Sequence, residues 1–125
     1  MRKRLSVVVF LIFSFTLFVS CSVQNGLLMN GDINSTKTSM NGSYEKFTGK
    51  YYKKIKFNKG DLLECTVNST TNKGELILLL LDKDDNIVAD LKDTTNIEIS
   101  QNGYYYFTAI GINHSGDFEI EWSKK

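Results

Sequence analysis

The chain has 125 residues, a length that allows one domain. It carries 15 lysines and arginines against 14 aspartates and glutamates, and three of the basic residues are Arg2, Lys3 and Arg4. The rest of the chain therefore has 12 basic and 14 acidic residues, a net charge of −2. This balance excludes the basic excess on which nucleic-acid binding depends, so we expect no nucleic-acid partner.

The first twenty residues have the pattern of a targeting signal. The basic residues at positions 2–4 precede a mostly apolar run, residues 5–19, which is shorter than the ~20 residues that span a bilayer. A basic start followed by an apolar core of this length is typical of a secretory signal peptide, here residues 1–20. Ser20, a small residue, then precedes Cys21, and this arrangement resembles a bacterial lipoprotein signal.

The resemblance to lipoprotein signals implies that the sulfur of Cys21 receives a lipid and that cleavage makes Cys21 the first residue of the mature protein. The implied location is extracytoplasmic, with the cell membrane as a partner through the lipid on Cys21. Phe18 departs from the family pattern, which usually has leucine three positions before the cysteine. The alternative is an ordinary secretory peptide, cleaved nearby, that leaves Cys21 free or paired with Cys65.

Residues 21–43 are expected to form the lipidated cysteine and a flexible tether, and residues 44–125 are expected to form the folded domain. Asparagine, glycine, serine and threonine dominate residues 22–43, and no apolar pattern of strand length persists there. The exception is the segment GLLM, residues 26–29, whose alternative interpretation is a strand that docks on the domain.

From Tyr44 onward, apolar and polar residues alternate with the period of two that is typical of β-strands. Turn-forming residues occur at 58–61, 84–86 and 101–103, and we also expect a loop at 70–74 and a turn at 113–117. This spacing predicts an all-β fold, an antiparallel β-sandwich of jelly-roll type with about seven or eight strands. The alternation predicts a core made of Ile55, Phe57, Leu63, Cys65, Val67, Leu76, Leu78, Leu80, Val88, Ile97, Ile99, Tyr105, Phe107, Phe118, Ile120 and Trp122.

The chain contains no proline, so the edges of the predicted sheet need another form of protection. Lys50, Lys53, Lys54 and Lys56 lie on the first strand of the domain, where charged side chains discourage pairing with a second chain. Cys65 alternates in phase with apolar neighbours, so we expect a buried thiol that acts as a small hydrophobe.

Four short segments between residues 59 and 122 carry a further family resemblance. They are Lys59-Gly60-Asp61, Leu76-x-Leu78-x-Leu80 with Asp82, Gly103-x-Tyr105-x-Phe107, and Gly116-x-Phe118-x-Ile120-x-Trp122. These segments are similar to segments of small extracytoplasmic lipoproteins of Gram-positive bacteria and of the jelly-roll domains that follow secreted bacterial peptidases, the bacterial pre-peptidase C-terminal domains. In peptidases such domains are accessories without catalysis, so the resemblance implies a non-enzymatic binding or scaffolding module, for which we expect no cofactor.

The acidic residues that follow residue 81 have part of the spacing of a calcium-binding loop. Ile87, however, stands where that loop needs glycine, and the flanking segments have the pattern of strands and not of helices. A hairpin turn is therefore the favoured interpretation, and a looser calcium site made of Asp82, Asp84 and Asp85 is the alternative.

His114, Ser115 and Asp117 are the residue types of a catalytic triad, but they are neighbours in one predicted turn. A triad needs its base between the nucleophile and the orienting carboxylate, which close neighbours in a tight turn seldom achieve. The chain has one histidine, so zinc sites of the Cys/His kind are excluded by number. We expect no enzyme activity, with an enzyme of unrecognised type as the alternative.

Tyrosines provide the candidate ligand-binding residues. Tyr104 and Tyr106 have the outward phase of their predicted strand, and Tyr51 and Tyr52 form a second pair. Aromatic side chains exposed on a sheet stack on sugar rings or anchor protein partners, whereas cross-strand aromatic pairing is the structural alternative. Cross-strand pairing is the favoured interpretation of these tyrosines, and a cell-envelope glycan or protein is the candidate partner if they bind, with a carbohydrate-binding module that uses Tyr104 and Tyr106 as an alternative function.

Overall fold

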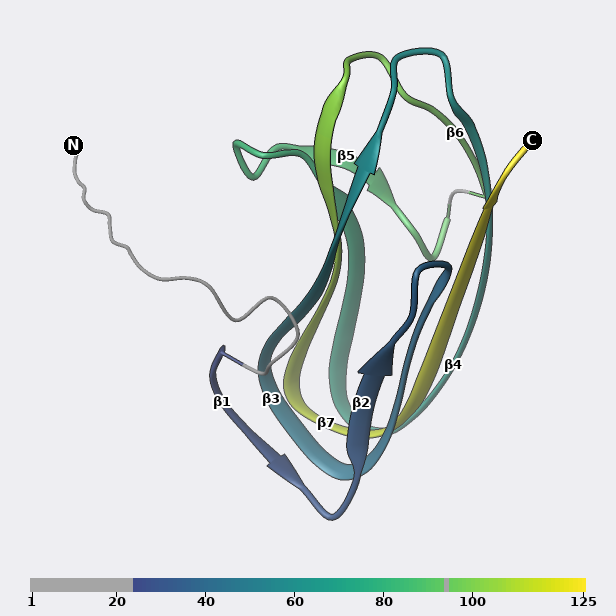
Figure 1. Cartoon of the computed structure of the whole chain (residues 1–125). Coiled ribbons are helices and arrows are strands. Elements are labelled where there is room, and N and C mark those ends of the chain that lie inside the picture. The colour runs from purple at the N-terminus through teal and green to yellow at the C-terminus, as the bar shows by residue number, and fades with distance from the viewer. Residues whose placement is uncertain (1–23, 94) are drawn as a thin grey trace, which may run out of the picture.

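The computed structural model describes residues 24–93 and 95–125, so the predicted signal peptide and Cys21 lie outside the described residues. The fold is all-β and antiparallel, which confirms the predicted class (Figure 1). Its strands are β1 Gln24–Met29, β2 Asp32–Ser35, β3 Ser39–Phe57, β4 Leu62–Leu81, β5 Ile87–Asp90, β6 Asn96–Glu98 and β7 Gly103–Lys124.

The seven strands form one hydrogen-bonded sheet in the order β1-β3-β7-β4-β5, with β2 pairing on β3 and β6 pairing on β4. Strands β3, β4 and β7 are long, with 19, 20 and 22 residues, and all three curve through the lower part of Figure 1. Because they bend together, the sheet folds over on itself and forms the two layers of a sandwich.

Each layer contains one half of every long strand. The first layer consists of β2, β6 and residues 39–44, 62–71 and 114–124 of the three long strands. The second layer consists of β1, β5 and residues 47–57, 75–81 and 103–111 of the same strands. β7 lies between β3 and β4 in both layers, so it is the central strand of the whole fold.

At the bend, the pairing register of the long strands shifts at residues 44–49 of β3 and 71–75 of β4. Such bulges bend a strand and increase its twist without ending it. Gly74 has a φ of 76°, and a Cβ at that position would overlap with the carbonyl oxygen of Asn113. Glycine therefore allows β4 to bend closely against β7.

The loop predicted at 70–74 and the turn predicted at 113–117 are wrong. Both segments continue β4 and β7 through the bend, with Lys73 paired with Ser115 and Thr71 with Gly116. Polar residues and glycines in these segments are the signals of turns in the sequence. Here they accommodate the bend, and the ladder continues on either side of them.

The core lies between the two layers. Phe107 of the second layer stacks on Trp122 of the first, with ring centroids 3.7 Å apart and an interplanar angle of 8°. Ile55 and Val67 pack against the core as partly buried residues. The predicted members that are buried are Phe57, Leu63, Cys65, Leu76, Leu78, Leu80, Ile97, Ile99, Tyr105, Phe107, Phe118, Ile120 and Trp122.

Val88 is the wrong member of the predicted core, since it is 37% exposed while Ala89 is buried. The pairing of β4 with β5 has an irregularity between Leu80 and Leu81, and Leu80 pairs with Ala89. Because side chains alternate between the faces of a strand, a shift of one residue exchanges the inward and outward positions.

The flexible tether expected over residues 21–43 is wrong from Gln24 onward, because residues 24–43 include β1, β2 and the start of β3. Met40 is fully buried, and Leu28 and Ile33 pack against the core. Ile33 and Met40 each stand between two polar residues, and Leu28 stands between two exposed apolar ones, since only one face of each strand is buried. The alternative interpretation of residues 26–29 as a docked strand is confirmed by the pairing of β1 with β3.

Candidate functional site

The outer surface of the second layer carries three of the four predicted tyrosines. Tyr105 and Phe107 are buried in the core, so their neighbours Tyr104 and Tyr106 point outward on β7. Tyr104 is 46% exposed, and Tyr52 and Tyr106 are half-buried. We call this surface the tyrosine face and define it by Tyr52, Tyr104, Tyr106, Ile77, Ile110, Lys50, Lys54 and Lys56.

Aromatic and cationic contacts order the tyrosine face. The ring of Tyr52 on β3 meets the ring of Tyr106 on β7 edge to face, with centroids 5.4 Å apart and an interplanar angle of 75°. Lys54 Nζ lies 4.4 Å from the centroid of the Tyr104 ring, a cation–π contact. Burial raises the pKa of Tyr106, and the neighbouring Tyr52 raises it further. The Tyr106 hydroxyl is therefore neutral at physiological pH.

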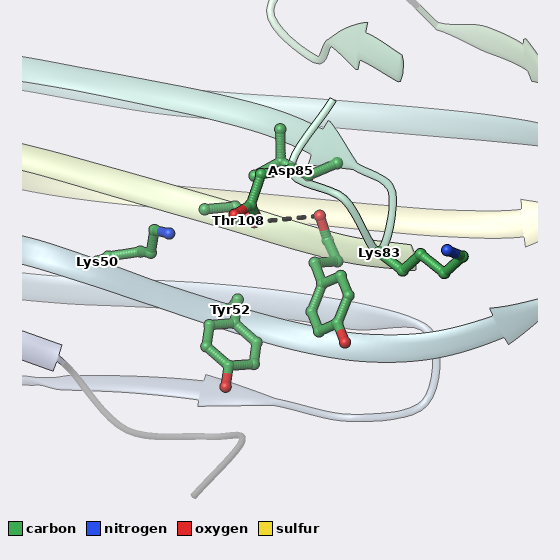
Figure 2. A pocket seen from close by; sticks show the side chains of 7 residues that line it. Lys50, Tyr52, Lys83, Asp85 and Thr108 are labelled. Atoms are coloured by element: carbon green, nitrogen blue, oxygen red, sulfur yellow. Dashed lines mark hydrogen bonds between the residues drawn. The ribbon is translucent and has the colours of Figure 1, made fainter. Parts of the chain in front are cut away.

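A shallow depression of about 170 Å³ opens on this face (Figure 2). Lys50 and Lys83 lie on opposite sides of it with Tyr52 between them, and the Thr108 hydroxyl donates a hydrogen bond of 3.1 Å to the carbonyl oxygen of Tyr106. Sites that enclose small molecules are usually several hundred Å³. The depression therefore suits a surface contact with aromatic and cationic groups better than an enclosed reaction site.

Tyr51 does not belong to this site, although the sequence grouped it with Tyr52. It is 2% exposed, and its hydroxyl lies 3.3 Å from the hydroxyl of Ser35 on β2, within hydrogen-bond distance. Successive side chains of a strand point to opposite faces, so one of the two tyrosines had to enter the core.

The opposite outer surface, on the first layer, is acidic. Thr66 pairs with Glu121 and Asn68 pairs with Glu119 across β4 and β7, and these side chains are exposed. We call this surface the acidic face and define it by Glu64, Asp117, Glu119 and Glu121. The two outer surfaces of the sandwich thus differ in charge as well as in aromatic content.

His114 lies fully buried at the bend, where it joins the three long strands. Its Nδ1 is 2.7 Å from the hydroxyl of Tyr44 on β3, and its Nε2 is 2.8 Å from the hydroxyl of Thr71 on β4. Burial lowers the pKa of His114 and raises that of Tyr44, so both groups are neutral near pH 7. Lys92 also lowers the pKa of the imidazole, and Asp117 partly opposes this.

The three residues of triad type in the predicted turn, His114, Ser115 and Asp117, do not form a catalytic triad. Both ring nitrogens of His114 bond to Tyr44 and Thr71, whereas Asp117 is exposed and Ser115 pairs with Lys73. The partners Tyr44 and Thr71 were not identified from the sequence. The inward phase of Tyr44 could have indicated that this residue is buried. Its hydrogen bond with His114, a residue 70 positions away, has no signature in the local sequence.

Asp82 organises a turn. Its carboxylate accepts backbone N–H bonds from Asp84 at 2.8 Å and from Asn86 at 2.9 Å, and these bonds, led by that from Asn86, lower its pKa. Within residues 24–93 and 95–125, no group of three or more His, Cys, Asp or Glu side chains could hold a metal ion. The looser calcium site of Asp82, Asp84 and Asp85 therefore gains no support from the geometry.

Cys65 is a buried free thiol, and burial raises its pKa to about 11. A thiol with so high a pKa is almost entirely protonated at neutral pH, and the thiolate is the reactive form. Cys65 therefore acts as a small hydrophobe in the core.

No family model matches this chain, and no curated protein matches it. No helix in the described part of the chain has the length and apolar character needed to cross a membrane. The tyrosine face combines aromatic, apolar and cationic side chains on one surface, and it is the candidate functional site.

Proposed function

We propose that this protein is a lipid-anchored, extracytoplasmic β-sandwich that acts as a non-catalytic binding or scaffolding module at the cell surface. The observation that carries the proposal is the tyrosine face, where Tyr52, Tyr104 and Tyr106 gather with lysines on one outer surface of a filled sandwich. Exposed aromatic groups of this kind are typical of interaction surfaces.

The absence of enzyme activity is part of the proposal, and the state of the described polar groups supports it. His114 and Tyr44 bond to each other within the core, and Asp82 is engaged in its own turn. His114 and Tyr44 are buried, so a substrate cannot contact them as it must contact a general acid or base, and the Asp82 carboxylate, which borders a surface depression, is held by the backbone of its own turn.

The anchor is supported by the sequence, in which basic residues 2–4, the apolar run 5–19 and Ser20-Cys21 resemble a lipoprotein signal. Replacing Cys21 with alanine is expected to remove the lipid and to release the protein from membranes, because a thioether requires the cysteine sulfur. Fractionation of cells that produce either form tests this, with mass spectrometry of the native chain to detect the added acyl groups. Membrane retention of the alanine variant would contradict the anchor.

A carbohydrate-binding module is the second candidate function. The edge-to-face contact of Tyr52 with Tyr106 and the neighbouring Lys50 offer both an aromatic surface and a hydrogen-bond donor, which sugar rings use together. The shallow form of the depression suits a polymer that passes over the surface.

The double replacement of Tyr52 and Tyr106 with alanine is expected to weaken retention of the protein on cell-envelope material by about tenfold, since aromatic contacts contribute about 0.5–1.5 kcal/mol each. The matched control replaces Glu119 and Glu121 on the acidic face with alanine and is expected to bind as the native chain does. Thermal unfolding of each variant verifies that it is folded. Equal retention of the tyrosine variant, or no retention of the native chain, would rule out this function for the tyrosine face.

A further inference from the structure

The position at which β1 begins limits the distance between the domain and a lipid on Cys21. Only Ser22 and Val23 separate Cys21 from Gln24, the first residue of β1. Three steps of a fully extended chain reach about 11 Å at most. Gln24 pairs with Lys50 of β3, so a lipid on Cys21 has to lie beside the edge of the second layer at which Lys50 stands.

That edge is rich in lysine. The described pairing of β1 with β3 ends at Lys50, and residues 51–57 of β3 continue as the edge of the sheet. Lys54 and Lys56 stand on this edge and point to the tyrosine face, and Lys53 directly precedes Lys54 with the opposite phase of the strand. These cations lie on the side of the domain that the anchor brings closest to the bilayer.

The tyrosine face also carries the apolar groups that a membrane interface accepts. Ile77 pairs with Ile110 across β4 and β7, and Ile77 is 36% exposed. Tyr104, at 46% exposure, adds an aromatic ring with a polar tip. Tyrosine is enriched at the level of lipid headgroups because its apolar ring and its hydroxyl suit the two sides of that boundary.

The charge of the opposite surface favours one orientation. Glu64, Asp117, Glu119 and Glu121 of the acidic face lie on the first layer, away from the edge at which β1 begins. The carboxylates of the second layer's outer surface, Asp85 and Asp90, lie at its other side, toward β5. An anionic bilayer attracts the lysine edge and repels the acidic face, so electrostatic attraction is strongest when the β3 side of the tyrosine face turns toward the lipid.

We infer that the tyrosine face docks on the anionic bilayer in which Cys21 is anchored. Lys50, Lys54 and Lys56 bind the phosphate groups of anionic lipids, and Tyr104 enters the headgroup layer. The inference rests on the proposed function, because it names the partner of the same face. The anchor keeps the local lipid concentration high, so contacts that are individually weak hold the domain down.

Sedimentation with lipid vesicles tests the inference without the anchor. The chain from Ser22 to Lys125 contains every described strand and the whole core cluster. It is expected to bind vesicles that contain phosphatidylglycerol, to bind vesicles of phosphatidylcholine alone much less, and to be released in about 1 M salt, where screening is nearly complete.

A lysine variant and a matched control make the test specific to the face. Replacing Lys50, Lys54 and Lys56 with glutamine is expected to lower the partition coefficient by about a hundredfold, because each lysine near an anionic surface contributes about fivefold. The control replaces Lys37, Lys73 and Lys125 with glutamine. These lysines lie off the tyrosine face, and their replacement causes the same change in net charge. A thermal unfolding transition like that of the native chain verifies that each variant is folded.

The outcomes separate this inference from the proposed function. Equal loss with both triple variants, or equal binding to both vesicle types, overturns docking by this face. Absence of vesicle binding, while Tyr52 and Tyr106 still support retention on purified wall glycan, also overturns the inference and leaves the proposed function intact. A stable dimer that the Tyr52 and Tyr106 replacements dissociate overturns it as well, because a second copy then covers the face.

Discussion

Replacing Phe107 with alanine is expected to lower the free energy of unfolding by about 3–5 kcal/mol, the usual cost of truncating a buried phenylalanine. Phe107 is fully buried, stacks on Trp122 at 3.7 Å and meets the ring of Phe57 at 6.2 Å. It therefore joins the two layers of the sandwich, and its loss leaves a cavity between them. Denaturant unfolding followed by the fluorescence of Trp122, the single tryptophan, measures the change directly.

The matched control for Phe107 is Tyr104→Ala on the same strand, where the aromatic ring is on the outer surface. This substitution removes an exposed ring and its cation–π contact with Lys54, and is expected to change the free energy of unfolding by less than about 1 kcal/mol. A loss below about 1 kcal/mol for Phe107→Ala would contradict the placement of this ring between the two layers.

Replacing His114 with alanine is expected to lower the free energy of unfolding by about 2–4 kcal/mol, because it removes two hydrogen bonds and leaves the buried hydroxyl of Tyr44 without its partner. The three strands that meet at the bend then lose a shared contact. Denaturant unfolding measures the loss, and Thr71→Ala, which removes one of the two bonds, is expected to cost less. Equal stability of the native and His114→Ala chains would contradict a structural role.

His114 also makes stability depend on pH. Its pKa in the folded state lies below the ordinary value of about 6.5, chiefly because burial disfavours the charged imidazole. The unfolded chain therefore binds a proton that the folded chain does not, once the pH falls below about 6.5. Stability is complete above that pH and declines as the pH falls from there to the folded-state pKa.

The variant His114→Gln isolates this effect, since glutamine keeps a donor and an acceptor but does not titrate. Its free energy of unfolding is expected to stay level between pH 7 and pH 5, while that of the native chain decreases. The chain has no other histidine, so no second imidazole contributes in that range. The same pH slope in both proteins would show that another group causes it.

The tyrosine face illustrates how far local pattern predicts a site. Period-two alternation correctly sends Tyr104 and Tyr106 outward, because the phase of a strand is a local property. The same alternation, continued back from Ile55 and Phe57, places Tyr51 inward and Tyr52 outward, but it could not show that Tyr52 and Tyr106 meet. That contact depends on the pairing of β3 with β7, two segments about 50 residues apart.

The sequence by itself determined the all-β class, most of the core and the outward tyrosines of β7, because alternation within a strand needs no distant partner. Only the tertiary structure decided that residues 24–43 join the sheet and that β4 and β7 continue through the bend. It also decided that His114 is a structural residue bonded to Tyr44 and Thr71. Each of these outcomes depends on backbone pairing between segments that are far apart in the chain. Because of this pairing, polar residues and glycines that would otherwise end a strand allow it to bend and continue.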